Sequence, residues 1–125
     1  MKYLLDVSAL IALIWPAHVH HKRVSDWISG KKVVLCPITE LGFIRVSTST
    51  AFNASMADAR KALKDFISDE KAEWIAADLP GMEGEIAPSS GKTTDWYLAN
   101  LAAAHKMRWA TLDESARHPI AELIR

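Results

Sequence analysis

Short apolar segments alternate with segments of helical length along this chain, and that alternation restricts the fold more than any other feature. The apolar runs of strand length are residues 2–7, 32–36, 73–76 and 108–112. The stretches that predict helices are residues 9–14, 18–29, 40–47, 56–68 and 93–105. Strands separated by helices favour a mostly parallel sheet covered on both faces. We therefore expect an α/β fold with four to five strands.

The chain of 125 residues has the size of one compact domain, and no repeat or shift in composition divides it. We predict a single domain over residues 1–125. Residues 79–92 are rich in Pro, Gly and Ser and predict a loop that can hold one helical turn. Residues 120–124 fit a fifth strand or a terminal helical turn, and we favour the strand.

Composition excludes several classes of protein. Half of the residues are hydrophobic, which is enough for a continuous core and excludes disorder as the main state. No apolar window reaches about 18 residues, so we expect no membrane span. The N-terminus meets Asp6 too early for a signal peptide, and we expect a cytoplasmic protein. The single cysteine, Cys36, excludes an internal disulfide and a cysteine zinc site, and its apolar neighbours predict burial.

Four acids fall at places that lead to one edge of such a sheet. Asp6 ends the first predicted strand and Asp113 follows the fourth, while Glu40 and Asp95 lie in the first turns of helices. In open α/β sheets, ligands bind beyond the carboxyl ends of the strands. Each acid also has a simpler explanation, because the helix dipole favours acids in a first turn and turns often carry Asp. The combination of all four indicates a site.

Carboxylates that converge in this way repel one another, and a bound hard cation removes that penalty. We therefore expect Mg²⁺, with Mn²⁺ as an alternative, held by Asp6, Glu40, Asp95 and Asp113. A metal-bound water of lowered pKa can attack a phosphodiester, and the metal can stabilise charge on the phosphate oxygens. The net charge of zero argues weakly against a nucleic-acid substrate, although local patches decide steering.

The order of these residues resembles the PIN-domain ribonucleases, especially the VapC toxins of toxin–antitoxin pairs. The resemblance rests on Leu4-Leu5-Asp6-Val7-Ser8-Ala9-Leu10-Ile11, Pro37-Ile38-Thr39-Glu40-Leu41-Gly42-Phe43-Ile44-Arg45, Thr94-Asp95-Trp96-Tyr97-Leu98-Ala99 and Ala110-Thr111-Leu112-Asp113. It spans nearly the whole chain, and the segment around Glu40 is the most specific. Trp96 departs from the pattern, because a small residue is more usual after the third acid.

The resemblance implies a three-layer PIN-like fold and a Mg²⁺-dependent endoribonuclease. It also implies a cognate antitoxin that blocks the site, often a homodimer, and transfer or ribosomal RNA as the substrate by analogy. By the same resemblance the four acids are the catalytic and metal-binding residues. Ser8 matches the small polar residue that supports the first acid, and it can equally serve as a helix cap, as Thr39 can for the next helix.

Several other residues are candidates for RNA contact or for metal binding. Arg45, Lys92 and Arg117 lie in segments near the acidic edge and could hold phosphates, although solvated surface charge explains each of them. Trp96 is the tryptophan to consider for substrate contact, whereas we expect Trp27, Trp74 and Trp109 to be buried. His18, His20 and His21 resemble a metal cluster, but residue 20 lies off the face that the other two would share in a helix.

Three other functions compete with that of a PIN-domain ribonuclease. A haloacid-dehalogenase-type phosphatase needs a second Asp two residues after the first, where this chain has Ser8. A response-regulator receiver needs an acidic pair, a phospho-acceptor Asp and a Lys in an arrangement that is absent here. A PIN-like domain that only binds protein or RNA, without catalysis, is the alternative that we keep.

Overall fold

The computed structural model describes residues 1–125 and contains one parallel sheet of five strands. The strands are β1 (Lys2–Leu5), β2 (Lys32–Leu35), β3 (Glu73–Trp74), β4 (Arg108–Thr111) and β5 (Ala121–Leu123). Their order across the sheet is β3-β2-β1-β4-β5, and every neighbouring pair is parallel. The predicted α/β class is confirmed, as is the choice of a strand near the C-terminus.

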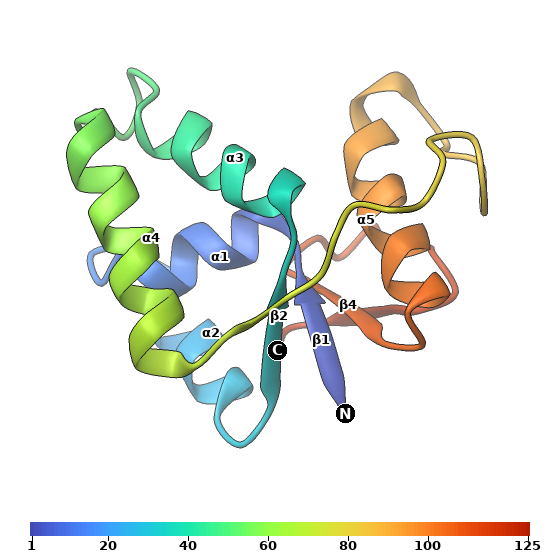
Figure 1. Cartoon of the computed structure of the whole chain (residues 1–125), viewed down its shortest axis with the longest axis horizontal. Coiled ribbons are helices and arrows are strands. Elements are labelled where there is room, and N and C mark those ends of the chain that lie inside the picture. Colours follow the sequence, from blue (N-terminus) through green and yellow to red (C-terminus); the bar gives the residue numbers. More distant parts are fainter.

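Helices cover both faces of the sheet. On one face lie α1 (Val7–Ile14), α2 (His21–Ile28), α3 (Pro37–Ser47) and α4 (Met56–Glu70), and on the other lies α5 (Thr93–Ala104), as Figure 1 shows. A short 3₁₀ turn, η1 (Ser90–Lys92), precedes α5. No helix is long and apolar enough to cross a membrane.

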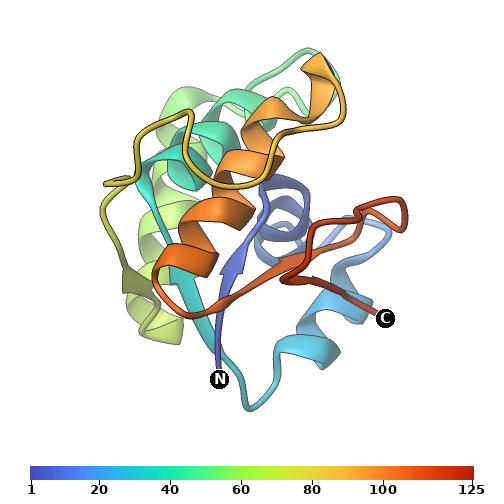
Figure 2. The same ribbon diagram turned by 90° about the vertical axis from the view of Figure 1, so that its right-hand side faces the viewer.

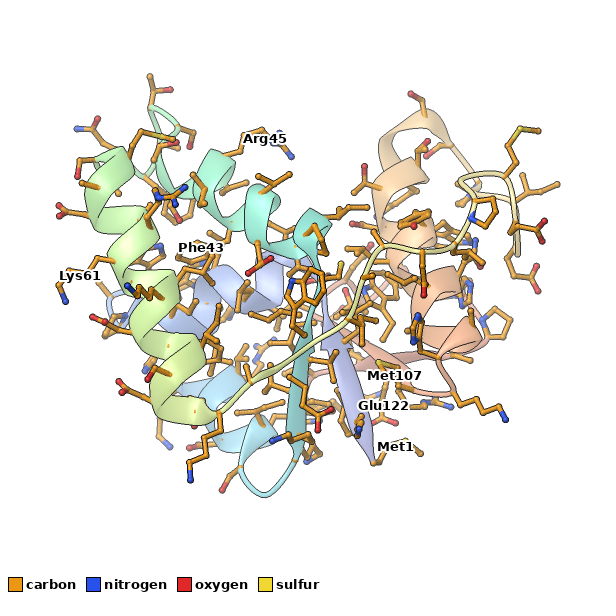
Figure 3. All side chains as sticks on the ribbon, viewed as in Figure 1. Met1, Phe43, Arg45, Lys61, Met107 and Glu122 are labelled. Atoms are coloured by element: carbon orange, nitrogen blue, oxygen red, sulfur yellow. The ribbon has the colours of Figure 1, made fainter.

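Two hydrophobic cores explain why the strands form where they do. Successive side chains of a strand point to opposite faces, so Tyr3 and Leu5 enter the core beneath α1–α4 while Leu4 enters the core beneath α5. Phe43 points from α3 into the first core (Figure 3), and Trp109 is fully buried in the second. Both faces of the central strands are therefore buried, as is usual in parallel sheets.

The helices α1 and α3 begin at places that differ from those expected from the sequence. Asp6, rather than Ser8, caps α1, because its side chain accepts the backbone N–H of Ala9. The helix α3 begins at Pro37, three residues before Glu40, since the fixed φ of proline suits a first helical turn. Thr39 is therefore inside the helix and fully buried instead of capping it.

Other boundaries differ by small amounts. The helix α2 begins at His21 rather than residue 18, and β3 is only two residues long. The helix α4 runs to Glu70 and ends where Lys71 takes a left-handed conformation. Neither Thr93 nor Thr94 caps α5, whose cap position is Lys92.

The loop between β3 and α5 crosses the outer side of α5 (Figure 2), where Tyr97 donates to the carbonyl of Leu79 at 2.8 Å and Asn100 makes three further hydrogen bonds. Asn100 Nδ2 donates to the carbonyls of Glu83 and Glu85, at 3.2 and 2.9 Å, and Asn100 Oδ1 accepts the N–H of Glu85 at 3.0 Å. Gly84 has φ +88°, and a Cβ there would lie 2.5 Å from Asn100 Cγ. The loop is thereby anchored just before it delivers Lys92 and Asp95 to the edge of the sheet.

Candidate active site

The connections of the sheet create a point where a ligand site is expected. The chain moves outward from β1 to β2 and β3, then returns through α5 to β4 on the other side of β1. Ligands of open α/β sheets bind beyond the carboxyl ends of the strands at such a switch point. The residue that follows β1 is Asp6, and Asp113 lies two residues beyond the end of β4.

Asp6 is held rigidly at the end of β1. Its backbone N–H donates to the carbonyl of Ala110 at 3.0 Å, which extends the pairing of β1 with β4. Its Oδ1 accepts the N–H of Ala9 at 2.7 Å, and the residue is only 3% exposed. The same carboxylate thus starts α1 and lies at the switch point.

Thr111 links the two strand-end acids. Its hydroxyl donates to Asp6 Oδ2, and the hydroxyl oxygen accepts the backbone N–H of Asp113 at 3.0 Å. Thr111 is buried, so this bond is shielded from water. Thr111 is not among the site residues expected from the sequence, although a hydroxyl in an apolar strand, two residues before an acid, is a usable signal. Ser8, to which the resemblance assigns the support of Asp6, is exposed, and the hydroxyl that donates to Asp6 is that of Thr111.

Asp113 is bonded through both of its carboxylate oxygens. Oδ1 accepts the backbone N–H of Ser115 at 2.9 Å and its hydroxyl at 2.7 Å, while Oδ2 forms an ion pair with the ammonium of Lys92. The bond from Lys92, followed by those from Ser115, lowers the pKa of Asp113 to about 2. This carboxyl is therefore ionised at neutral pH.

Asp95 lies in the first turn of α5 and is half-buried. Burial raises its pKa, and the charge of Asp113 adds to that, while the Lys92 ammonium acts in the opposite direction. Burial also raises the pKa of Asp6, to about 6, against the hydrogen bonds from Thr111 and Ala9. The charges of Asp95 and Asp113 contribute to the raised pKa of Asp6. Three of the four predicted acids therefore lie within range of one another's charge.

Glu40 is the acid that the structure does not bring into this group. Its Oε1 accepts the indole N–H of Trp74 at 2.9 Å, and its charge is not among those that perturb Asp6, Asp95 or Asp113. Because α3 begins at Pro37, Glu40 is the fourth residue of the helix rather than the first. Glu40 instead borders a groove between α3 and α4.

The acids have the oxygen donors that a hard divalent cation prefers. Their side chains, however, are not arranged around one ion in this structure. All donors are carboxylate oxygens, which Mg²⁺ and Mn²⁺ prefer. Burial first, and the charges of Asp95 and Asp113 after it, raise the pKa of Asp6, so a bound cation would favour its ionised form. No three acidic, histidine or cysteine side chains are placed to share one ion, and the Lys92 ammonium pairs with Asp113. The same absence of clusters applies to His18, His20 and His21.

The structure contradicts the expected exposure of two tryptophans, Trp96 and Trp74. Trp96 is 6% exposed and packs edge-on against Trp109 and His118, so its indole is not presented to a substrate. Trp74, which we expected to be buried, is 56% exposed, because β3 is a short strand at the edge of the sheet. Trp109 is buried as expected, and Trp27 is partly buried against Tyr3.

The three basic residues considered for phosphate binding have different surroundings. Lys92 pairs with Asp113 at the site. Arg45 is exposed on α3 and projects into solvent (Figure 3). The Arg117 guanidinium donates to the carbonyl of Glu114 at 2.8 Å, within its own turn. Only Lys92 therefore contacts one of the acids.

Comparisons with known proteins identify the family. The PIN domain family model matches residues 3–119. Ribonuclease VapC38 of Mycobacterium tuberculosis is 35% identical over 118 residues, which cover 88% of this chain and 84% of that protein. Ribonuclease VapC29 of the same species is 32% identical over 120 residues, covering 94% and 90%.

The fold also matches a solved structure. The structure of VapBC2 from Rickettsia felis bound to a DNA fragment from their promoter superposes with a TM-score of 0.64 over 98% of both chains. At 18% identity this likeness supports the fold alone. From the family match and the relatives above 30% identity, the chain belongs to the PIN domain family and, within it, to the VapC ribonucleases.

Proposed function

We propose that this protein is a divalent-metal-dependent endoribonuclease in which Asp6, Asp95 and Asp113 hold the metal, with Glu40 as the fourth acid. The observation that carries the proposal is geometric: the Thr111 hydroxyl links Asp6, at the end of β1, to Asp113, beyond the end of β4, and the charge of Asp95 on α5 reaches Asp6. Carboxylates from three distant segments are gathered at the switch point of the sheet, where their repulsion needs a cation.

The protein's own groups would divide the work at this edge. A bound Mg²⁺ would supply a water of lowered pKa and stabilise charge on the phosphate oxygens. Thr111 fixes the Asp6 carboxylate, and Ser115 fixes that of Asp113, so two of the acids are oriented before substrate arrives. Lys92 forms an ion pair with one of them and would contact an RNA phosphate.

Cleavage of a structured RNA in the presence and absence of Mg²⁺ tests this proposal. Transfer RNA and ribosomal RNA are the substrates to try first, by analogy with the family. We expect cleavage with Mg²⁺ or Mn²⁺, none in EDTA, and a loss of at least about 100-fold in Asp6→Asn. Asp65→Asn is the matched control, because Asp65 is exposed on α4 and pairs only with Lys61. Cleavage that continues unchanged in EDTA contradicts the metal mechanism.

One observation favours a second function, a PIN-like domain that binds without cutting. Three of the four acids already have side-chain partners, since Thr111 donates to Asp6, Lys92 pairs with Asp113 and Trp74 donates to Glu40. A binding module would retain RNA affinity in the variants Asp6→Asn and Asp95→Asn and would not cleave RNA whichever divalent metal is added. Measuring binding and cleavage on the same RNA therefore separates the two functions.

We also propose that the protein acts as the toxin of a pair, is blocked by a cognate antitoxin and forms a homodimer. The relative in Rickettsia felis is described in complex with its VapB partner. A groove of about 770 Å³ between α3 and α4 carries the exposed Leu41, with Arg60 and Lys64 along it, and is a surface that a partner could cover. Co-expression with the protein encoded next to this one should give a complex that no longer cleaves RNA. Light scattering of the free chain tests the dimer.

A further inference from the structure

The ammonium of Lys92 lies where the acidic site needs positive charge. Lys92 ends the turn η1 and directly precedes α5, so the same short segment delivers Lys92 and Asp95. Its ion pair with Asp113 Oδ2 leaves both side chains about one-third exposed, at 32% and 27%. The pair is therefore accessible from solvent and can open without unfolding of the core.

The other carboxylate oxygen of Asp113, Oδ1, is already hydrogen-bonded within its own turn. Ser115 donates to Oδ1 through both its backbone N–H and its hydroxyl, at 2.9 and 2.7 Å. These bonds fix the carboxylate and leave Oδ2 as the oxygen that meets an external cation. That oxygen is the one that Lys92 holds.

We propose that Lys92 is the built-in counter-ion of this site, and that a divalent cation is coordinated by Asp113 only after displacing the Lys92 ammonium. This inference rests on the proposed function, because it assumes that a divalent ion binds these acids. An ammonium and a divalent ion within a few ångströms repel each other, so both cannot share Oδ2. The displaced side chain stays near the site, because its backbone adjoins α5.

Two consequences follow for the protein without metal and with it. Without metal, Lys92 balances part of the charge of the three carboxylates and thereby stabilises the folded state. With metal, the same ammonium competes, so the affinity for the ion is lower than the carboxylates alone would give. Removing the ammonium should therefore strengthen metal binding, although it removes an ion pair.

Mn²⁺ binding followed by the electron paramagnetic resonance of the free ion tests the inference without any substrate. At low salt and pH 7.5 we expect Lys92→Met and Lys92→Gln to bind Mn²⁺ about three- to tenfold more tightly than wild type, the lower end matching a partly exposed ion pair. Lys92→Arg, which keeps the charge, should stay close to wild type. The matched control is Lys64→Met, because Lys64 is exposed on α4 and has no ion pair.

The outcomes separate this inference from the proposed function. If both neutral variants of Lys92 bind Mn²⁺ as weakly as wild type or more weakly, Lys92 is not a counter-ion that competes with the metal. The proposed metal site is unaffected by that result. The same gain in Lys64→Met would show a general effect of charge and also overturns this inference. Binding by the neutral variants but not by wild type supports the inference. No binding by any variant, together with cleavage in EDTA, removes both proposals. Circular dichroism confirms that each variant is folded.

Discussion

Replacing Asp6 by asparagine in the metal-free protein tests the electrostatics of the site directly. Burial, together with the charges of Asp95 and Asp113, raises the pKa of Asp6 from its ordinary 3.8 to about 6. In the unfolded chain the carboxyl keeps its ordinary value. Between these two pH values the folded protein holds more protons than the unfolded chain, so the free energy of unfolding falls as the pH rises.

The size of this effect follows from the two pKa values. A tenfold change in a protonation equilibrium corresponds to about 1.4 kcal/mol, so ionised Asp6 lowers the free energy of unfolding by about 3 kcal/mol above pH 7. Asparagine is neutral at every pH and is also a good helix cap. The stability of Asp6→Asn relative to wild type should therefore rise by about 2 kcal/mol between pH 4 and pH 8, because the unfolded carboxyl is already half ionised at pH 4.

Urea denaturation in EDTA, followed by tryptophan fluorescence, measures this difference at each pH. Asp65→Asn is the control, because Asp65 is exposed on α4 and belongs to no part of the acidic site. Below pH 4 the low pKa of Asp113 acts in the opposite direction, and stability is lost as the pH falls toward 2. Wild type and variant share that loss, so it largely cancels.

A stability difference between Asp6→Asn and wild type that does not change from pH 4 to pH 8 would refute the reasoning. Adding Mg²⁺ at pH 8 extends the test, because an ion bound to the native state stabilises it. Wild type should then gain stability and Asp6→Asn should gain little. An equal gain in both proteins would place the ion elsewhere.

Two further substitutions test contacts that support the site. Thr111→Val removes the hydroxyl that donates to Asp6 with little change in shape, and we expect a loss of about 1–3 kcal/mol in stability and at least tenfold in cleavage. Urea denaturation and the RNA assay measure both, and unchanged cleavage would remove Thr111 from the site. Gly84→Ala would force a Cβ against Asn100 at positive φ, and we expect a lower melting temperature by calorimetry. Gly81→Ala is its control, since nothing lies within 4 Å of that Cβ, and equal melting temperatures would contradict the account of the loop.

The order of strands and helices could be predicted because it depends on apolar periodicity, which is local in sequence. The first residues of the helices could not be predicted, because several residues near each start can serve as the cap. At the first helix Asp6 and Ser8 are both good caps, and the pairing of Asp6 with Ala110 across the sheet decides between them. The same limit explains Trp74, whose apolar neighbours do not reveal that its strand lies at an edge.

The acids at strand ends could be placed from sequence because the carboxyl ends of parallel strands meet at one edge. The hydrogen-bond partners of these acids could not be predicted, because the bonds join residues that are remote in the chain. Thr111 and Asp6 are 105 positions apart, and Lys92 and Asp113 are 21 apart. The contacts that set the pKa values of the acids therefore appear only in the folded structure.

Glu40 shows how a helix can separate a residue from a site that its sequence position suggests. It follows β2, a neighbour of β1, so the strand order alone brings it close to the same edge. The early start of α3 turns its carboxylate toward Trp74, whose indole N–H is the only hydrogen-bond donor it meets. Trp74 is exposed and this bond is open to water, so breaking it costs little compared with moving a buried group. A role for Glu40 in metal binding therefore requires its side chain to rotate away from Trp74, at a small cost in free energy. Asp6, in contrast, is already fixed in place by Ala9 and Thr111.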